Sequence, residues 1–322
     1  GWGVGLLARG EEGLQAARSE IESMGGEAML LIADVADEAQ VEAAAQAVEQ
    51  RWGGIDAWIN NAMVTLYCEV LEASPEQFRR ATEVTYLGTV WGTQSALRRM
   101  QKRNAGAIVQ VGSALAYRSI PLQSAYCGAK SAVRAFTDSL RSELIREKSG
   151  VRISMVQLSA FNTPQFDWSE TCLDRKAQPL PPIFQPEIAA QAIYYAATHR
   201  RRELWVGWPA VKAILGQRVM PGLLDRIAAQ RGHDGQISNE PLPEAPQSIL
   251  FRPVSRDHGA HGRFDDRAIS TSWQHRLNTH RFGFAVLAIA AAALAARVVG
   301  GVLMRRTEEG ARLLQKDALR RS

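Results

Sequence analysis

The stretch that decides the fold runs from residue 107 to residue 136. Residues 107–113 read AIVQVGS, and residues 124–136 read SAYCGAKSAVRAF. The apolar run from Ala107 to Val111 is typical of a strand buried on both faces, and the second stretch opens a helix expected to last to Glu147. A fully buried strand followed by a long helix is the building unit of a parallel sheet.

The same alternation continues on both sides of this stretch. Strands are expected at 3–8, 28–32, 55–59, 151–156 and 204–207, and helices at 11–24, 38–52, 74–103 and 186–199. Ser74 and Pro75 suit the N-cap and the first position of the third of these helices. Strands that alternate with helices over about 200 residues indicate a doubly wound, Rossmann-like α/β domain spanning residues 1–208.

The character of the chain changes after Trp208. Residues 209–281 form a C-terminal extension and linker, with room for two short helices broken at Pro221-Gly222 and then a loosely packed arm. Residues 282–304 have Arg297 as their only charge, and as a terminal hydrophobic helix they would be about 34 Å long. Such a helix either spans a membrane or lies on its surface. A basic tail, 305–322, completes the chain.

Charge and cysteine content exclude several classes of protein. The net charge is +5, and +4 of it lies between Arg297 and Ser322, so a nucleic-acid-binding body is disfavoured. Cys68, Cys127 and Cys172 are far apart in the sequence, which argues against a disulfide framework or a structural zinc site. No metal is expected. A reducing compartment follows, so the expected location is cytoplasmic, with or without a membrane anchor.

Three residues carry the chemistry. Tyr126 and Lys130 are four residues apart at the start of a helix, and Ser113 ends the preceding strand. Reducing a carbonyl or oxidising an alcohol needs a proton donor or acceptor beside the reacting carbon. A tyrosine serves near neutral pH when an ammonium stabilises its phenolate, and a serine hydroxyl holds the substrate oxygen.

With these residues the chain resembles the short-chain dehydrogenase/reductase family from about Gly3 to Gly207. The resemblance rests on Asp34-Val35, Asn60-Asn61-Ala62, Val111-Gly112-Ser113 and the YxxxK segment from Tyr126 to Lys130. It implies an NAD(P)-dependent oxidoreductase with Tyr126 as acid/base. Lys130 would tune the pKa of Tyr126 and hold the nicotinamide ribose. Asp34 and Val35 would hold the adenine ring, and Asn61 and Ala62 would line the cofactor cleft.

The chain departs from the family pattern in four places. The glycine-rich turn TGxxxGxG is absent together with its strand and helix, so the chain reads as N-terminally truncated, lacking its first β-α unit, and is expected to bind either cofactor poorly. Thr85 stands in the place of the catalytic asparagine. Met63 replaces a glycine, and Ser159-Ala160 replaces a Pro-Gly pair, whereas Thr163 still fits the threonine that contacts the nicotinamide end.

Arg9 lies just past the second strand of the family pattern. An arginine there accommodates the 2′-phosphate of NADP, so NADP is expected rather than NAD. Phe161, Phe166 and Trp168 lie in the loop where this fold places its substrate lid. They either wall a pocket for a lipophilic carbonyl or alcohol or only anchor the loop to the domain.

Two hypotheses about function follow. The first is an NADP-dependent enzyme that interconverts an alcohol and a carbonyl, with a small-molecule substrate and without a nucleic-acid partner. The alternative is a catalytically weak Rossmann-like binding or scaffold protein anchored by its C-terminal helix. Helices 74–103 and 125–147 form the dimer face in proteins of the resembled family, so the resemblance also implies a homo-oligomer.

Overall fold

The structure, a computed structural model, describes residues 1–279. Gly1–His275 form one compact unit, and Arg276–Ser322 are assigned to a second one. The first unit is built around a parallel sheet in the order β11-β6-β5-β3. Its strands are β3 (Ala57–Asn60), β5 (Gly106–Ser113), β6 (Val151–Leu158) and β11 (Glu203–Val206). The prediction of a Rossmann-like α/β fold is therefore confirmed.

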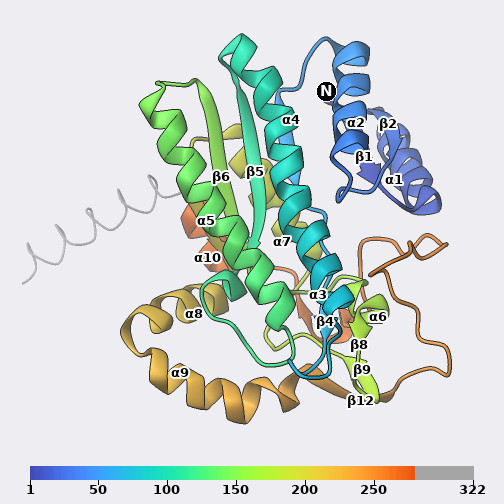
Figure 1. Ribbon diagram of the computed structural model, residues 1–322, viewed down its shortest axis with the longest axis vertical. Helices are drawn as coiled ribbons and strands as arrows, with labels where there is room; N and C mark the ends of the chain where they lie inside the picture. Colours follow the sequence, from blue (N-terminus) through green and yellow to red (C-terminus); the bar gives the residue numbers. More distant parts are fainter. Residues whose placement is uncertain (280–322) are drawn as a thin grey trace, which may run out of the picture. The chain divides into compact units, whose positions relative to one another are not determined.

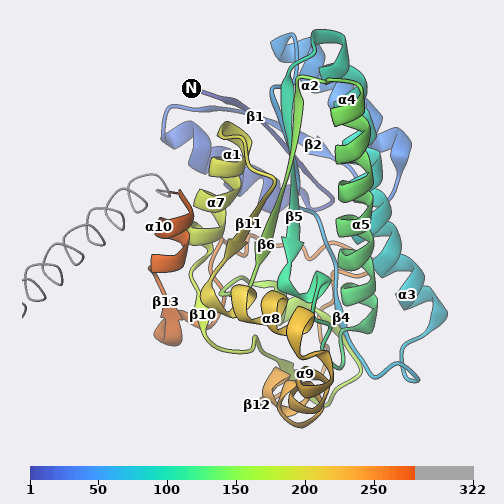
Figure 2. The same cartoon turned by 90° about the vertical axis from the view of Figure 1, so that its left-hand side faces the viewer.

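Helices cover both faces of this sheet, as Figure 2 shows with the sheet between α7 and α5. The covering helices are α2 (Glu38–Trp52), α4 (Gly88–Arg103), α5 (Ser124–Arg146) and α7 (Pro186–Thr198). Neighbouring residues of β5 point to opposite faces: Ile108 packs with α2, α4 and α5, and Val109 packs with α7. This two-sided burial explains why the strands are continuously apolar in sequence.

A separate parallel pair, β1 (Gly3–Ala8) and β2 (Glu27–Ile32), precedes the sheet in the chain and flanks α1 (Glu11–Ser23). No hydrogen-bonded ladder joins β1 to β3 within residues 1–279. Ile32 and Ile59 are about half exposed. β1 and β2 therefore form a two-stranded sheet separate from the four-stranded one.

The expected start of the third helix is confirmed in detail. Ser74 accepts a hydrogen bond from Gln77, and the Gln77 side chain bonds back to the Ser74 amide, which completes a capping box for α3 (Pro75–Thr82). A π-helical turn, Glu83–Leu87, then joins α3 to α4. Such turns insert an extra residue and reorient the side chains on them. This turn carries Thr85.

The segment that closes over the carboxyl edge of the sheet consists of short elements. They are β4 (Leu66–Tyr67), β7 (Ala160–Phe161), α6 (Gln165–Trp168), β8 (Glu170–Thr171), β9 (Arg175–Ala177) and β10 (Ile183–Phe184). We call residues 160–184 the lid. Tyr67, Phe166 and Ile183 meet there in one buried apolar cluster. The lid is thereby packed onto the domain rather than projecting from it.

The C-terminal extension differs from the loosely packed arm that its composition predicts. Two helices broken at Pro221 are present, α8 (Trp208–Val219) and α9 (Pro221–Ile227), followed by a π-helical turn, Ala228–Gly232. Further on, β12 (Ile237–Pro241) pairs with β9, and β13 (Ala268–Ile269) pairs with β10, before α10 (Trp273–Thr279). We call residues 242–263 the arm. The polar composition of this stretch did not predict β12 and β13, because both strands are short and are formed by pairing with strands of the lid.

The expectation of unpaired cysteines is wrong. Cys68 and Cys172 form a disulfide across 104 residues of sequence. The physical reason is the parallel pairing of β4 with β8, in which Tyr67 lies opposite Thr171, so that the next residues along each strand face each other. The spacing of the cysteines along the sequence does not predict this strand register. Cys127 is a buried free thiol.

The hydrophobic segment 282–304 and the tail 305–322 lie outside the described residues. Among residues 1–279, no helix is both long enough and apolar enough to cross a bilayer.

Candidate active site

The structure brings the three predicted catalytic residues together. Ser113 is the last residue of β5, and Tyr126 and Lys130 lie on successive turns at the start of α5. Their exposed fractions are 6%, 9% and 3%, so all three side chains are withdrawn from water. The Ser113 hydroxyl lies near the Tyr126 phenol and acts to lower its pKa. The end of a buried strand and the first turns of the next helix thus place a serine hydroxyl beside a phenol at the carboxyl edge of the sheet.

Burial dominates the acid–base properties of this group. It raises the pKa of the Tyr126 phenol well above its usual value, and the nearby Ser113 hydroxyl only partly opposes that rise. Burial also lowers the pKa of Lys130 to about 8. The Lys130 ammonium donates to the Val111 carbonyl at 2.6 Å and lies 5.8 Å from the centre of the Tyr126 ring. This placement does not give the lowered tyrosine pKa that the resemblance implies.

The lowered pKa of Lys130 predicts a pH-dependent difference in stability. In the unfolded chain the ammonium keeps its proton up to about pH 10.5, whereas in the folded protein it releases the proton near pH 8. Stability rises with pH where the unfolded state binds more protons, so the penalty of burying Lys130 is relieved between these values. We expect Lys130→Met to be more stable than the unmodified protein at pH 7 and to lose that advantage toward pH 10.

Urea midpoints of both proteins at pH 7, 8, 9 and 10 measure this difference, and alkaline effects common to both cancel in it. A difference that stays constant across the series contradicts a lysine that titrates near pH 8.

Thr85 is fully buried on the π-helical turn. Its hydroxyl accepts a hydrogen bond from the Val64 amide and donates to the Val64 carbonyl, both at 3.1 Å. The loop that follows β3 is therefore tied to the turn between α3 and α4. With both of these bonds made to the backbone, Thr85 acts by positioning that loop.

The residues predicted to hold the adenosine end of the cofactor also lie together, and they are joined by an arginine that was not predicted from the sequence. Arg9 follows β1 and Asp34 follows β2, and Arg80 of α3 forms an ion pair with Asp34. The Arg9 Nη2 donates to the carbonyl of Ile249, and its Nη1 is buried without a hydrogen-bond partner. Val35 packs in a buried cluster with Ala81 and neighbouring residues. An Asp–Arg ion pair spanning 46 residues has no local signal in the sequence.

The remaining predicted cofactor residues lie along the same edge. Asn61 and Ala62 follow β3 and are exposed, whereas the neighbouring Asn60 is held inside by hydrogen bonds to Thr93 and Gln110. Thr163 follows β7 and is half-buried. The polar network around Asn60 is a second feature that the sequence analysis missed.

The lid aromatics follow the anchoring alternative. Phe161 belongs to the sheet core with Phe184, and Phe166 packs edge-on against Phe264 with ring centres 5.5 Å apart. Trp168 packs against His258 of the arm at 4.0 Å between ring centres. Phe166 also lines a cavity beside α6 and contacts Tyr67 next to the catalytic group.

These residues fit the two ends of NAD(P) but not its middle. The unpartnered Nη1 of Arg9 is a buried cationic donor suited to a phosphate, and Ser113, Tyr126 and Lys130 suit the reacting end. Helix α1 is a poor pyrophosphate site because its first turn carries Glu11 and Glu12. Within residues 1–279 no glycine-rich turn opens a helix beside the catalytic group.

The parallel sheet, the nucleotide-binding edge and the buried serine–tyrosine–lysine group define a nicotinamide-dependent α/β oxidoreductase. A family model described as short chain dehydrogenase matches residues 1–171, and the chain belongs to the short-chain dehydrogenase/reductase family. It is therefore an NAD(P)-dependent dehydrogenase/reductase that acts on CH–OH or C=O groups. This assignment favours the enzyme over the scaffold hypothesis.

Several relatives support the assignment. The chain is 30% identical over 250 residues to an uncharacterized oxidoreductase, YxnA, of Bacillus subtilis, covering 77% of this chain and 70% of the relative. It is 33% identical over 181 residues to 2-(R)-hydroxypropyl-CoM dehydrogenase of Xanthobacter autotrophicus, covering 55% and 72%. Among solved structures, an alcohol dehydrogenase of Thermococcus sibiricus complexed with 5-hydroxy-NADP is 25% identical, with a TM-score of 0.55 over 64% of this chain and 86% of that one.

Proposed function

We propose that this protein is an NADP-dependent oxidoreductase that interconverts an alcohol and a carbonyl on a lipophilic substrate, with Tyr126 as the acid/base. The observation that carries the proposal is the burial of Ser113, Tyr126 and Lys130 together at the end of β5 and the start of α5. Two hydroxyls in a site withdrawn from water can hold and protonate one oxygen atom.

The roles of the chain's own residues follow from their protonation states. When bound, the nicotinamide cofactor supplies or accepts the hydride. Tyr126 is a neutral phenol at neutral pH because burial raises its pKa, so it is ready to donate a proton to a carbonyl oxygen. The Ser113 hydroxyl positions that oxygen, and Lys130 places a positive charge nearby that stabilises the phenolate left when the proton is donated.

The lipophilic substrate class is supported by the surroundings of Tyr126. Tyr67 lies near Tyr126 and is buried. It belongs to the apolar cluster with Leu122, Phe166 and Ile183. A panel of aldehydes and ketones of increasing chain length, assayed with NADPH in the full-length protein, tests this class. We expect kcat/KM to rise with chain length. Turnover of none of the panel in either direction would overturn the proposed function.

The NADP preference is tested by Arg9→Asp. A charge-assisted hydrogen bond is worth about 1.5–3 kcal/mol, so the variant should bind NADPH ten- to a hundredfold more weakly. NADH affinity should change far less, because NADH lacks the 2′-phosphate. Fluorescence titration of both cofactors with the full-length protein measures the two affinities.

Arg18→Asp is the matched control, since it makes the same charge change on the exposed face of α1. Equal loss of both cofactors in Arg9→Asp, or none of either, would count against a role for Arg9 in phosphate recognition.

A further inference from the structure

The adenosine end of the proposed cofactor site is occupied by a segment of the chain itself. The Leu250 side chain is completely buried in the cluster that contains Val35 and Ala81. The neighbouring Ile249 packs against the same cluster. Leu250 thus lies in the same apolar cluster as Val35, where an adenine ring is expected.

The two arginines of this end are engaged by the same segment. Arg9 donates to the Ile249 carbonyl, and the Arg80 Nε donates to the Leu250 carbonyl at 2.9 Å. Both guanidiniums are half-buried or more, so neutral carbonyls occupy the donors that a phosphate would take. The Arg9 Nη1 remains buried without a hydrogen-bond partner, which shows that the carbonyl does not satisfy the whole guanidinium.

The same segment of the arm also lies close to the backbone at Gly10 and contacts the lid. A Cβ atom placed on Gly10 would lie 3.5 Å from the Cβ of Pro253. The Ile249 amide donates to the Trp168 carbonyl at 3.1 Å. The arm therefore joins the adenosine end to lid helix α6.

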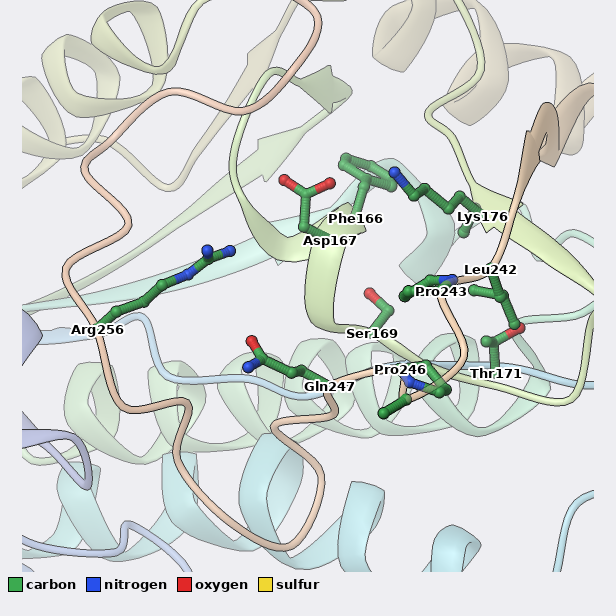
Figure 3. A pocket seen from close by; sticks show the side chains of 12 residues that line it. Phe166, Asp167, Ser169, Thr171, Lys176, Leu242, Pro243, Pro246, Gln247 and Arg256 are labelled. Carbon is green, nitrogen blue, oxygen red and sulfur yellow. The ribbon is translucent and has the colours of Figure 1, made fainter.

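Elsewhere the arm is separated from the lid by a cavity of about 330 Å³, seen in Figure 3 between α6 and the segment from Leu242 to Gln247. Polar side chains, among them Asp167, Lys176 and Arg256, line much of it. Figure 1 shows the arm, in orange, as a long run without helix or strand. The arm is also held at its two ends, where the Leu242 amide donates to the Asp174 carbonyl and Arg263 pairs with Asp167. Residues 249–254 lie between these ends, so they can leave the cluster without opening the sheet core.

We propose that Ile249–Val254 is an autoinhibitory plug that competes with the cofactor for the adenosine end. Binding of the cofactor requires the plug to withdraw and Arg9 and Arg80 to exchange backbone carbonyls for phosphate oxygens. Because the Ile249 amide donates to the Trp168 carbonyl, withdrawal also breaks the contact between this segment and lid helix α6. This proposal rests on the NADP site of the proposed function.

Adenosine 2′,5′-bisphosphate is the probe, because it occupies only the adenosine end and needs no pyrophosphate cradle. Calorimetric titration of the 322-residue protein gives the reference affinity. Leu250→Asp places a charge in the apolar cluster and should expel the plug, so that the probe binds at least tenfold more tightly. Leu223→Asp, the same change at a half-exposed leucine of α9, should leave the affinity unchanged.

A locked plug provides the converse test and does not depend on Leu250→Asp folding. The Cβ separation between positions 10 and 253 suits a disulfide, so the pair Gly10→Cys and Pro253→Cys should fix the plug when oxidised. We expect the oxidised pair to bind the probe at least tenfold more weakly and to regain affinity on reduction. The unmodified protein, titrated with and without reductant, controls for Cys68–Cys172. Hydrogen exchange at Ile249–Val254 in the unmodified protein should speed up when the probe is added.

The outcomes separate this proposal from the proposed function. Equal probe affinity in the unmodified protein, Leu250→Asp and the oxidised pair overturns the plug and leaves the NADP site standing. Absence of probe binding in every variant, including the reduced pair, overturns both. Unchanged hydrogen exchange at 249–254 on probe binding likewise overturns the plug.

Discussion

Tyr126→Phe in the full-length protein is expected to lower kcat about a thousandfold, because general acid–base catalysis by a positioned group contributes about 10²- to 10⁴-fold. The substitution removes one hydroxyl from a side chain that is only 9% exposed and keeps the ring that fills the space. Ser113 still accepts a hydrogen bond from the Leu115 amide, so the end of β5 keeps its conformation. Cofactor affinity should therefore stay within threefold of the parent.

The measurement is kcat in both directions, together with the dissociation constant of NADPH. Tyr194→Phe is the matched control, since Tyr194 is 60% exposed on α7 and lies outside the catalytic group. Activity of Tyr126→Phe within tenfold of the parent would remove the tyrosine from its role. Parallel loss of cofactor binding would indicate a structural defect instead of a lost proton.

Cys172→Ser is expected to cause the largest loss of stability. A disulfide that closes a loop of 104 residues stabilises the folded chain by about 5 kcal/mol in the chain-entropy description. For a domain of this size that corresponds to a decrease in Tm of about 10 °C. The lid should be released first, because Cys172 follows β8 and Cys68 follows β4, and only two residue pairs join these strands.

Thermal unfolding with and without reductant checks this effect. Reductant should lower the Tm of the unmodified protein and leave that of Cys172→Ser unchanged. Titration of denatured protein with a thiol reagent should find one free thiol, Cys127, before reduction and three afterwards. Three free thiols in protein purified without reductant would contradict the disulfide.

The alternating elements were predictable because each is specified by local pattern. The helix at 38–52 coincides with α2, and Ser74 caps α3 as its residue type and position require. The catalytic group was equally predictable. Tyr126 and Lys130 lie on successive turns of one helix face, and Ser113 ends the preceding strand, so the parallel sheet brings all three to one edge.

Contacts between distant segments decided the rest. Asp34 forms an ion pair with Arg80, Cys68 forms a disulfide with Cys172, and Leu250 packs in the cluster that includes Val35. All three contacts join segments that meet only in the folded chain. The protonation of Tyr126 belongs here too, because burial and the direction of the Lys130 ammonium set its pKa. Sequence by itself determined the family, the sheet and the choice of candidate catalytic side chains, since these depend on periodicity and short spacing. Only the tertiary structure decided how those side chains are charged and what covers the adenosine end, because burial and long-range contacts leave no periodic signal in the chain.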